Sequence, residues 1–539
     1  MTINSSITAT GTGNRTLGLS SGSGGTVNAD IDEGSATLGF SISGAWDFTG
    51  NNTFSGQTTL NKSATLRLKG AQAIDGNASY QLYRNARLEL LTDDSGTVAA
   101  ASEIVLRRND TSTGIMQDYT IHVANNGGGT TGTTVNVGNV DYSIGDVRPP
   151  RQLNFEGGNG YSVQVGDVTL DTEMQSSVSG GSQRLRGNTA PVDITGTVKQ
   201  VNGNSGLRPN SNNLFLGGTN TGNVVSGAIA DADDYTNSTN PNAAPLNVYK
   251  GDSGTWTLSG VNTYTGDTTI TGGILEIGGT GQLGAGNYAG NIAINSSNPL
   301  FWNSSANQTL GGTVSGSGGL AKDNTGTLTL VGMNTYAGQT NISGGTLLVN
   351  GTLSAGASSV NVAPGATIGG SGLIQRNVNL NASVVSPGAS VGTLTVEGDV
   401  VWNDSTLVVE IADPDGSQGF GWDFLAVNGL LSPGTSSKFN IEVVSDFGPG
   451  SDPFDLPVAS SPYELDPDVW IESFFDVFYD PADFDGTFGA YVEDTGSGAL
   501  IYLKFAPTSQ NIIPEPSTFL IWALGLIALA WYARRRRTK

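Results

Sequence analysis

Short runs in which apolar and polar residues alternate recur along most of the chain. They hold apolar residues at positions i and i+2, as at Leu88/Leu90, Ile121/Val123, Leu153/Phe155, Val192/Ile194 and Leu214/Leu216. Because successive side chains of a strand point to opposite faces, this pattern predicts short, half-buried β-strands. Their spacing of roughly ten to twenty-odd residues favours one strand per turn of a coil, with loops of varying length between strands.

The clearest repeat relates two segments at a constant offset of 72 residues. Residues 254–278 read GTWTLSGVNTYTGDTTITGGILEIG, and residues 326–350 read GTLTLVGMNTYAGQTNISGGTLLVN. The matched positions include Lys250/Lys322, Asn262/Asn334, Tyr264/Tyr336 and the pairs Gly272-Gly273/Gly344-Gly345. A degenerate earlier copy at residues 44–70 places Trp46 where Trp256 lies, and its second half slips by one residue.

Each copy of the repeat reads as short strands joined by tight turns. In TLTL, Leu328 and Leu330 share one strand face, and the threonines share the other. Glycine and asparagine between the strands provide turns with positive φ, and we expect the repeated corner asparagine to stack on the amide of its neighbour. Strands of three to five residues cannot build a core alone, so we expect stacked coils, a β-solenoid.

The composition changes near the C-terminal end. Residues 386–411 still alternate, whereas WDFLAVNGLLS, KFNIEVV and AYVEDTGSGALIYLKF predict longer strands in an acidic module. We expect this module to cap the open end of the solenoid, which would otherwise expose unpaired strand edges. The predicted organisation is irregular solenoid coils at 1–250, the repeats and following coils at 251–411, the acidic β cap at 412–507 and a tail at 508–539.

The repeat units resemble the autotransporter-associated β-strand repeat. SPGASVGTLTVEGDV at residues 386–400 also resembles the segment that often follows such repeats. The resemblance is specific over about residues 220–411 and weak before them. It implies a right-handed parallel β-helix like an autotransporter passenger.

Charge is distributed unevenly along the 539 residues, whose formal net charge is −23. Residues 397–505 carry 21 Asp and Glu against only Lys438 and Lys504. The chain has no evident basic face, so we expect no nucleic-acid partner. Cysteine is absent, which excludes a disulfide framework, a thiolate zinc site and a cysteine nucleophile.

Clustered carboxylates in the acidic module raise the question of calcium. DPDG at 413–416 and DPADFDG at 480–486 place carboxylates beside a glycine, as a hard cation requires. The second departs from the EF-hand pattern, because aligning Gly486 to the loop glycine puts Pro481 first. We interpret both as turns, expect no cofactor, and leave calcium open with Asp413, Asp415, Asp480, Asp483 and Asp485 as candidates.

Catalytic chemistry finds little support in the sequence. A glycosidase needs two carboxyls at a fixed separation, yet Asp267 falls on Gln339 and Glu276 on Leu348, so we expect no carboxylate ladder along the coil. The single histidine, His122, lies in the alternating run IHVAN and fits a strand-surface residue. We therefore expect that the protein is not an enzyme.

Several arginines lie between the first and second copies of the repeat, including Arg107-Arg108 and Arg184-x-Arg186. We interpret them as part of a solvated face of the coil. A patch that binds an anionic ligand is the alternative.

The chain ends in NIIPEPSTFLIWALGLIALAWYARRRRTK. The apolar run at 518–533 has 16 residues, about 24 Å as a helix against a hydrocarbon core of roughly 30 Å. Trp522 and Trp531 lie near its ends, where interfacial aromatics are common, and the arginines that follow should stay in the cytoplasm. These features predict a single-pass membrane helix with the body outside the cytoplasm.

The tail resembles a PEP-CTERM protein-sorting signal, which combines a Pro-Glu-Pro motif, a transmembrane segment and a basic end. The resemblance implies that an exosortase-type enzyme of a Gram-negative bacterium recognises the tail and removes it near the motif. The body would then reach the cell surface or the exopolysaccharide matrix. The matching residues are Pro514, Glu515 and Pro516 in the motif, and Arg534, Arg535, Arg536 and Arg537 in the basic end.

Proteins with this tail normally begin with a secretory signal peptide. The N-terminal MTINSSITATGTGNR has neither a basic region nor an apolar region of that kind. We therefore expect the true start of the protein to lie upstream of Met1. A fragment of a longer chain and export by another route are the alternatives.

Taken together, the expected fold class is all-β, a right-handed parallel β-helix (β-solenoid) with a C-terminal β cap and one C-terminal transmembrane helix. The expected function is that of an exported structural or adhesive protein of the cell surface or extracellular matrix. Expected partners are the sorting enzyme, the membrane through the C-terminal helix, and exopolysaccharide or matrix components bound by Asn, Thr and Ser side chains. A polysaccharide-degrading β-helix enzyme and a calcium-stabilised spacer stay open as alternatives.

Overall fold

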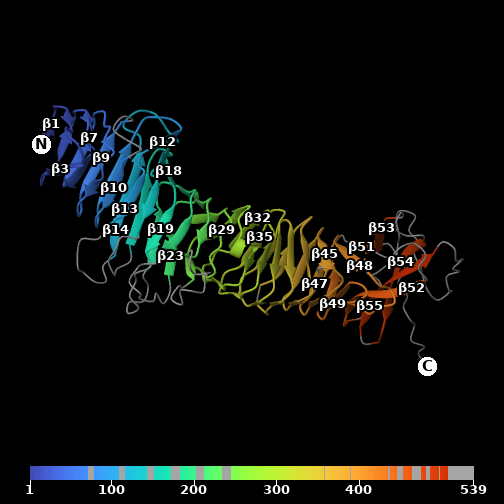
Figure 1. Ribbon diagram of the computed structural model, residues 1–539. Coiled ribbons are helices and arrows are strands. Elements are labelled where there is room, and N and C mark those ends of the chain that lie inside the picture. Colours follow the sequence, from blue (N-terminus) through green and yellow to red (C-terminus); the bar gives the residue numbers. More distant parts are fainter. Residues whose placement is uncertain are drawn as a thin grey trace, which may run out of the picture. The chain divides into compact units, whose positions relative to one another are not determined.

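The structure is a computed structural model of the chain. It describes residues 1–70, 78–107, 116–142, 151–171, 182–201, 212–232, 245–356, 358–388, 390–434, 438–445, 453–463, 475–480, 486–496 and 498–507. The chain divides into two compact units, unit 1 at residues 1–285 and unit 2 from residue 286 onwards. In both units the described residues form short β-strands that lie one coil upon the next (Figure 1).

Unit 1 contains three large parallel sheets. Sheet I has the order β1 (Thr2–Ile3), β4 (Gly25–Val27), β7 (Ala45–Phe48), β9 (Thr65–Lys69), β11 (Arg87–Leu91), β14 (Gln117–Ala124), β17 (Arg151–Gly157), β20 (Ser182–Gly187), β23 (Asn212–Gly217), β26 (Leu246–Lys250) and β28 (Thr268–Ile270). Sheet II has the order β3 (Arg15–Ser20), β6 (Leu38–Ser43), β8 (Thr58–Leu60), β10 (Ser79–Leu82), β13 (Glu103–Leu106), β16 (Asn139–Asp141), β19 (Val168–Asp171), β22 (Val198–Val201) and β25 (Ile229–Ala230). Sheet III has the order β12 (Thr97–Ala99), β15 (Thr134–Asn136), β18 (Ser162–Val165), β21 (Val192–Ile194), β24 (Asn223–Val225), β27 (Thr255–Leu258) and β29 (Ile274–Gly279), and β2 (Ile7–Thr8) pairs separately with β5 (Ile31–Asp32).

Unit 2 is built in the same way. Sheet IV has the order β32 (Leu300–Ser304), β35 (Leu320–Lys322), β38 (Thr340–Ile342), β41 (Val360–Val362), β44 (Val378–Asn381), β47 (Val400–Asn403) and β50 (Leu431–Pro433). Sheet V has the order β30 (Asn287–Tyr288), β33 (Gln308–Leu310), β36 (Thr327–Leu330), β39 (Thr346–Val349), β42 (Thr367–Gly370), β45 (Val384–Pro387), β48 (Thr406–Ile411), β51 (Phe439–Ser445) and β53 (Phe475–Tyr479). Sheet VI has the order β37 (Met333–Asn334), β40 (Thr352–Leu353), β43 (Leu373–Ile374), β46 (Thr393–Val396), β49 (Phe424–Val427), β52 (Phe454–Ser461), β55 (Ala499–Pro507) and β54 (Gly486–Asp494), while β31 (Ile292–Ile294) pairs with β34 (Val314–Ser315).

Each complete coil contributes a strand to three sheets in turn. In unit 1, β11, β12 and β13 belong to sheets I, III and II, and β14, β15 and β16 repeat that order one coil later. In unit 2, β38, β39 and β40 belong to sheets IV, V and VI. The parallel β-solenoid architecture is confirmed, but the prediction of one strand per turn is wrong, because neighbouring apolar runs fall on different sides of the same coil.

The core of each unit consists of the inward-facing residues of these sheets. Trp46 and Trp256 in unit 1 and Trp302 and Trp402 in unit 2 are completely buried. In unit 2, the ring of Trp402 stacks on Phe439 with 4.2 Å between ring centroids. Because every strand is short, this apolar surface is buried between the sides of the coil and between neighbouring coils rather than within one strand pair.

All three copies of the repeat fold alike. In each copy, two consecutive strands each pair with a strand of the following coil. The pairs are β6 with β8 and β7 with β9, β26 with β28 and β27 with β29, and β35 with β38 and β36 with β39. Trp46 pairs with Leu66, whereas Trp256 pairs with Leu275. The first copy is therefore one residue longer between its second and fourth strands, which accounts for the slip in its sequence.

The acidic segment begins as further coils and ends as an antiparallel arrangement. β49, β50 and β51 continue the parallel sheets, whereas β55 runs antiparallel to both β52 and β54. The rings of Phe454, Phe488 and Phe505 cluster there, with 5.2 Å between the centroids of Phe454 and Phe505. That residues 412–507 protect the end of the coil stays a prediction.

Within the described ranges, no helix is long and apolar enough to cross a membrane. The predicted membrane helix at 518–533 lies outside the described residues, as do the motif residues Pro514, Glu515 and Pro516 and the basic residues Arg534, Arg535, Arg536 and Arg537.

The paired glycines of the repeat are required by backbone geometry. Gly345 has φ +61°, and a Cβ atom there would lie 2.2 Å from the carbonyl oxygen of Asn324. Gly365 also has positive φ, at +76°, but a Cβ atom there would meet nothing within 4 Å. The two glycines therefore separate the cost of the backbone conformation from the cost of a steric clash.

We expect Gly365→Ala to destabilise unit 2 by about 1 kcal/mol, the cost of a left-handed conformation for a residue with a Cβ. We expect Gly345→Ala to cost roughly 1–3 kcal/mol more, because the coil must also move away from the new methyl group. Urea unfolding of both variants, followed by circular dichroism, measures the difference. Equal destabilisation of the two variants would show that the close approach of coils at Gly345 relaxes freely.

Candidate functional site

The outward side of sheet I in unit 1 carries a continuous set of polar and aromatic side chains on β17, β20, β23 and β26. We call it the polar face, and its residues are Gln152, Asn154, Arg184, Arg186, Asn213, Phe215, Asn247 and Tyr249. Strand register places Gln152, Arg184, Phe215 and Tyr249 in one column, with one residue on each successive coil. Adjacent strands lie roughly 4.8 Å apart, so the members of the column are neighbours on successive coils.

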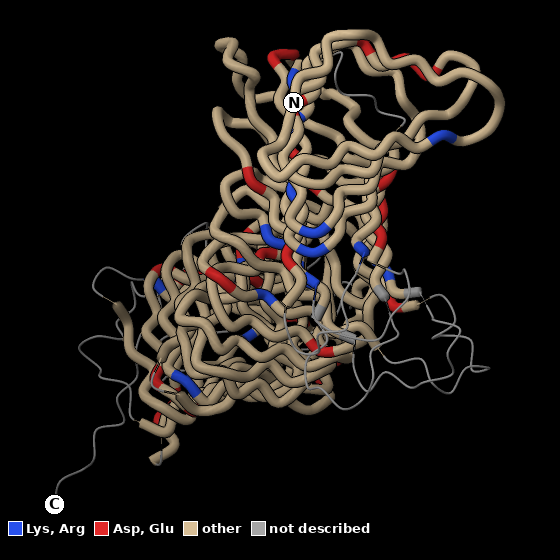
Figure 2. The backbone as a smooth tube through the Cα atoms, turned by 90° about the vertical axis from the view of Figure 1, so that its left-hand side faces the viewer, with Lys and Arg blue, Asp and Glu red and all other residues tan. Residues whose placement is uncertain are grey.

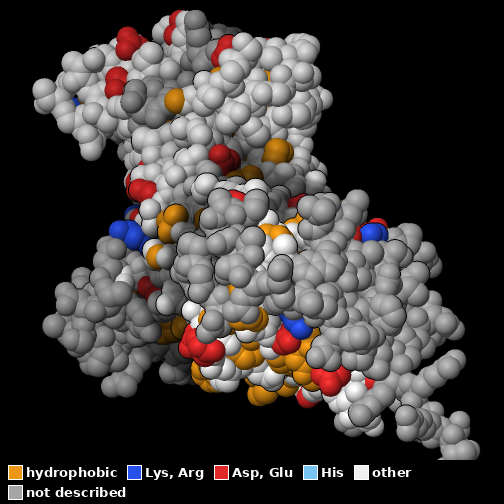
Figure 3. Space-filling model, turned by 90° about the vertical axis from the view of Figure 1, so that its right-hand side faces the viewer, with side chains coloured by type: hydrophobic (Ala, Val, Ile, Leu, Met, Phe, Trp, Pro, Cys, Tyr) orange, Lys and Arg blue, Asp and Glu red, His pale blue; other side chains and the backbone are white. Residues whose placement is uncertain are grey.

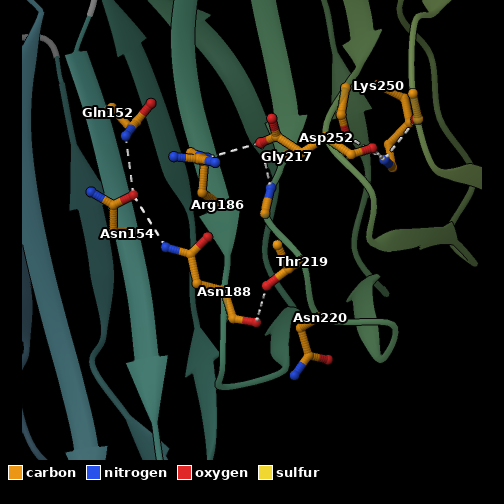
Figure 4. Close-up of polar contacts among 12 residues, drawn as sticks. Gln152, Asn154, Arg186, Asn188, Gly217, Thr219, Asn220, Lys250 and Asp252 are labelled. Atoms are coloured by element: carbon orange, nitrogen blue, oxygen red, sulfur yellow. Dashed lines mark hydrogen bonds and ion pairs between the residues drawn. The ribbon is translucent and has the colours of Figure 1, made fainter.

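Hydrogen bonds within and between coils hold the amides of the polar face in place (Figure 4). Gln152 Nε2 donates to Asn154 Oδ1 at 3.1 Å, and Asn188 Nδ2 donates to the same oxygen at 3.4 Å. Asn247 Nδ2 donates at 3.1 Å to Oδ1 of Asn213 on the preceding coil. These contacts fix the direction in which each amide presents its remaining donors and acceptors.

The two arginines of the polar face differ in their partners. Arg186 Nε forms an ion pair with Asp252 Oδ2 at 2.9 Å, and the same oxygen accepts a hydrogen bond from the backbone N–H of Gly218 (Figure 4). Arg184 instead places its guanidinium over the ring of Phe215, 4.2 Å from the ring centroid. Arg186 is thus paired and Arg184 is stacked on a ring, and the interpretation of the arginines as a solvated face stays a prediction.

Nearer the N-terminus, sheet I carries a ladder of alternating charge. Register aligns Asp47, Arg67, Glu89, His122 and Glu156 on successive coils. Figure 2 marks where acidic and basic residues lie along the backbone. The expectation that acidic positions form no ladder is corrected in this region, because acids recur on alternate coils. An arginine or lysine side chain lies between or beside these acids and neutralises their negative charge.

Each acid of this ladder is bonded to a cation. Arg67 Nε bonds Glu89 at 2.6 Å, Arg87 joins Glu89 to Glu156 through contacts of 2.6 Å each, and Lys69 Nζ bonds Asp47 at 2.6 Å. Burial alone would raise the pKa of Glu89, but the hydrogen bonds from Arg87 and Arg67 lower it below its ordinary value. Glu89 is thus held as an anion, which suits a structural role and not that of a general acid.

His122 lies on the outward side of β14 within this ladder, with its side chain 25% exposed. Its Nδ1 is 3.9 Å from Glu156. Partial burial, together with the positive charge of Arg87, lowers the pKa of His122. The imidazole is therefore neutral at neutral pH and stands between two carboxylates that arginines already neutralise.

Two lysines of the repeat are completely buried at equivalent corners. Lys250 Nζ donates to the carbonyl oxygens of Gly251, Asp252 and Gly272, the last at 3.0 Å. Lys322 Nζ donates in the same way to Asp323, Asn324 and Gly344 at 2.7, 2.9 and 3.2 Å. Burial lowers the pKa of each lysine to about 8, although a nearby aspartate opposes the shift.

The corner asparagines make a different set of contacts from the one expected. Asn262 Oδ1 accepts from the backbone N–H of Ile229 on the preceding coil, and its Nδ2 donates to Gln282 O on the following coil. Asn334 repeats this pattern with Val314 and Thr352. The expected stacking of corner amides is thus wrong, because each amide binds backbone groups of both neighbouring coils instead.

Amide ladders do occur, but on a flat side of the coil. Asn361 Nδ2 donates to Asn341 Oδ1, and Asn379 Nδ2 donates to Asn361 Oδ1, both at 2.8 Å. These residues lie on β38, β41 and β44 of sheet IV.

The calcium candidates divide between described and undescribed residues. Asp413 accepts a hydrogen bond from the N–H of Asp415 at 3.0 Å, as expected for a turn, and Asp480 follows β53. Asp483 and Asp485 lie outside the described residues. Among the described side chains, no group of three or more His, Cys, Asp or Glu could hold a metal ion.

Acidic and apolar side chains share the surface near the end of unit 2. The space-filling view in Figure 3 shows both kinds on the face that it presents. The most exposed large apolar side chain of the described residues after 286 is Phe420, at 86%, beside the turn of Asp413 and Asp415. Exposure of a single ring at a turn does not define a site.

Asp423 is the buried carboxylate that most resembles a catalytic acid. Burial raises its pKa to about 7, against the opposing hydrogen bonds from the backbone N–H groups of Glu410 and Gly392. Those two bonds, at 3.0 and 2.8 Å, occupy both carboxylate oxygens and join neighbouring coils. Asp423 therefore has a structural role, because its carboxylate holds the backbone of Gly392 and of Glu410 together.

Sequence reasoning identified the arginines and the histidine of unit 1, but missed Phe215, Tyr249 and the buried role of the two lysines. Lys250 and Lys322 could have been found, because both stand at an apolar position of an alternating strand. Ile42 occupies that position in the first copy, where it pairs with Leu60 as Lys250 pairs with Ile270.

Comparison with known families gives two kinds of match. The Passenger-associated-transport-repeat family matches residues 43–68, 248–277 and 320–349, and the PEP-CTERM protein-sorting motif matches residues 513–537. The chain therefore contains autotransporter-type repeats and a PEP-CTERM sorting motif, and both predicted resemblances are confirmed. Together they indicate an exported, surface-associated protein, and the motif implies processing by an exosortase-type enzyme.

Two curated proteins share a short region with the chain. Over 101 residues, the chain is 38% identical to an extracellular serine protease of Serratia marcescens. The aligned region is 19% of this chain and 9% of the protease. Over 99 residues, it is 32% identical to the adhesin BmaC autotransporter of Brucella suis biovar 1 (strain 1330). That aligned region is 18% of this chain and 3% of the adhesin. The chain thus spans less than a tenth of the length of either relative.

We expect Lys250→Met to destabilise unit 1 by about 1–3 kcal/mol at pH 7, because methionine fills the space of the lysine stem but leaves buried carbonyl oxygens without a donor. Lys62→Met is the matched control, since Lys62 is exposed in the same unit. Chemical denaturation of both variants measures the effect. Equal stability of the two variants would mean that water satisfies these carbonyls.

The same lysine also predicts a pH dependence. Its pKa in the folded chain is about 8, below the ordinary value of about 10.5. Between these values the unfolded chain binds one more proton than the folded chain, so stability should rise with pH relative to Lys250→Met. Parallel stability curves for the wild type and the variant from pH 7 to 10.5 would contradict the lowered pKa.

Proposed function

We propose that the protein is an exported structural or adhesive component of the cell surface or extracellular matrix. The observation that carries this proposal is the presence of autotransporter-type repeats and a PEP-CTERM motif in one chain. In this proposal the tail is the substrate of an exosortase-type enzyme, and its helix holds the chain in the membrane until the body is released.

The described surfaces support a non-catalytic role. The amide ladders and the charge ladder present side chains in columns whose members are bonded to one another, and Asn213 and Asn247 of the polar face are bonded in the same way. Such columns are rigid and repetitive, so they offer many equivalent hydrogen-bonding positions to an extended partner. We propose exopolysaccharide or neighbouring matrix molecules as that partner.

The alternative of a polysaccharide-degrading enzyme is less well supported. A retaining or inverting glycosidase needs one carboxyl that carries a proton and one that does not, at a fixed separation. On the described coils, Glu89 and Glu156 are paired with arginine, and Asp423 is occupied by backbone N–H groups. The calcium-stabilised spacer rests on Asp413, Asp415, Asp480, Asp483 and Asp485, and unfolding with and without a chelator tests it.

We expect the surface form of the protein to lack residues 534–539, as measured by the mass of the protein released from the cell surface. Changing Pro514, Glu515 and Pro516 together to alanine should leave the full-length chain in the membrane fraction, because the sorting enzyme no longer recognises the tail. Changing Thr508, Ser509 and Gln510 to alanine is the matched control and should leave sorting intact.

Recovery of Arg534 to Lys539 in the mature surface protein would contradict processing near the motif. Normal release of the variant without the Pro-Glu-Pro motif would show that the tail acts only as a membrane helix.

A further inference from the structure

Arg184 lies at the centre of the polar face, where no acidic side chain of the described residues pairs with it. Its guanidinium forms no ion pair with any described residue, and its Nε is shielded from solvent without a hydrogen-bond partner. Its neighbour Arg186, two positions along the same strand, is neutralised by Asp252 at 2.9 Å. One of the two arginines therefore keeps an uncompensated charge and unused N–H donors.

The ring under Arg184 is fixed by glycines. A Cβ atom on Gly251 would lie 2.2 Å from Phe215 Cζ, and one on Gly217 would lie 2.8 Å from Phe215 Cε1. The ring of Phe215 thus lies against bare backbone of its own strand and of the next coil. Any larger residue at these glycines would displace the ring, so the stack of Arg184 on Phe215 is built into the coil.

Polar side chains surround this stack on the same side of the sheet. Asn213 and Asn247 bond one another on the strand positions before Phe215 and Tyr249, and Asn154 and Gln152 bond one another on the coils before Arg184. Tyr249 follows Phe215 in the column. The site thus combines a planar cation, two aromatic rings and amides that are already oriented.

The chemistry of this set selects one class of ligand. A guanidinium presents a fork of donors that matches a carboxylate, and stacking on a ring orders it before binding. Aromatic rings offer an apolar surface to the C–H face of a sugar, and amides offer both donors and acceptors to hydroxyl groups. The net charge of −23 opposes long-range attraction of a polyanion, so binding must come from this local, unpaired charge.

We propose that Arg184, Phe215, Tyr249 and Asn247 form a binding site for an acidic polysaccharide, with Arg184 bound to a sugar carboxylate and the chain lying along successive coils. This inference rests on the proposed extracellular function and names the ligand class for one part of the surface.

The test is binding of polygalacturonate to the full chain in a mild non-ionic detergent, measured by calorimetry. The same polymer with its carboxyls methyl-esterified is the control ligand, because it keeps the backbone and loses the charge. We expect the wild type to prefer the acidic form, and the preference to weaken as salt is raised. Arg184→Gln should weaken binding roughly tenfold or more, since a charged hydrogen-bond donor is lost.

Arg15→Gln is the matched control variant, since it removes the same charge from an exposed position of β3, and its binding should be unchanged. Arg184→Lys keeps the charge without the planar fork and should bind between the wild type and Arg184→Gln. Thermal unfolding of each variant checks that the coil is intact, and Arg184→Lys supplies the answer if Arg184→Gln does not fold.

Equal binding of the acidic and esterified polymers, or equal binding by Arg184→Gln and Arg15→Gln, would overturn the site. Failure of the proposed function looks different: surface delivery would be lost although purified chain still binds polygalacturonate. Conversely, normal delivery with no preference for the acidic polymer removes this inference and leaves the proposed function standing.

Discussion

Parallel stacking of coils is the constraint on which the rest of this structure depends. Strands of two to nine residues cannot bury enough apolar surface alone, so each must pair with the strand directly above and below it. In a parallel ladder this pairing aligns one residue per coil in a straight column. The type of residue allowed at a position therefore depends largely on its neighbours in the column, which lie many residues away in the sequence.

The same constraint explains the buried cations. Where a coil turns, carbonyl oxygens point inward and have no strand partner, and such groups are costly unless they receive a hydrogen bond. Lys250 and Lys322 reach these corners from an inward strand position, and Arg376 does so for the carbonyls of Tyr336, Gly338 and Ser354. The first copy of the repeat has a shorter corner and uses Ile42 instead, which indicates that the cation accompanies the longer turn.

The sequence was informative wherever the physical cause is local. Alternation of apolar residues predicted the strands, the constant offset of 72 residues predicted stacked repeats, and paired glycines predicted turns such as that at Gly345. The charge ladder and the Arg184–Phe215 stack were not predictable in this way. Their members meet only after the coil lengths are known, and these vary from 20 residues between Asp47 and Arg67 to 34 between Asn213 and Asn247. The number of strands per coil was missed for the same reason, because spacing alone does not say which side of the coil a run occupies.

The residues that stabilise the coil and the residues of the proposed binding site lie in different parts of the chain. The segments matched by the repeat family carry the buried lysines, the corner asparagines and the paired glycines, all of which satisfy backbone groups or tight turns. The part of the charge ladder from Glu89 to Glu156 and most of the polar face lie between the first two matched segments, where many coils are longer. Coils of minimal length leave few side chains beyond those needed to close the turn, and the proposed binding site accordingly lies on the less regular coils. In this proposal an extended partner would bind the irregular coils of unit 1. The repeats would maintain the strand register that keeps the columns of side chains aligned.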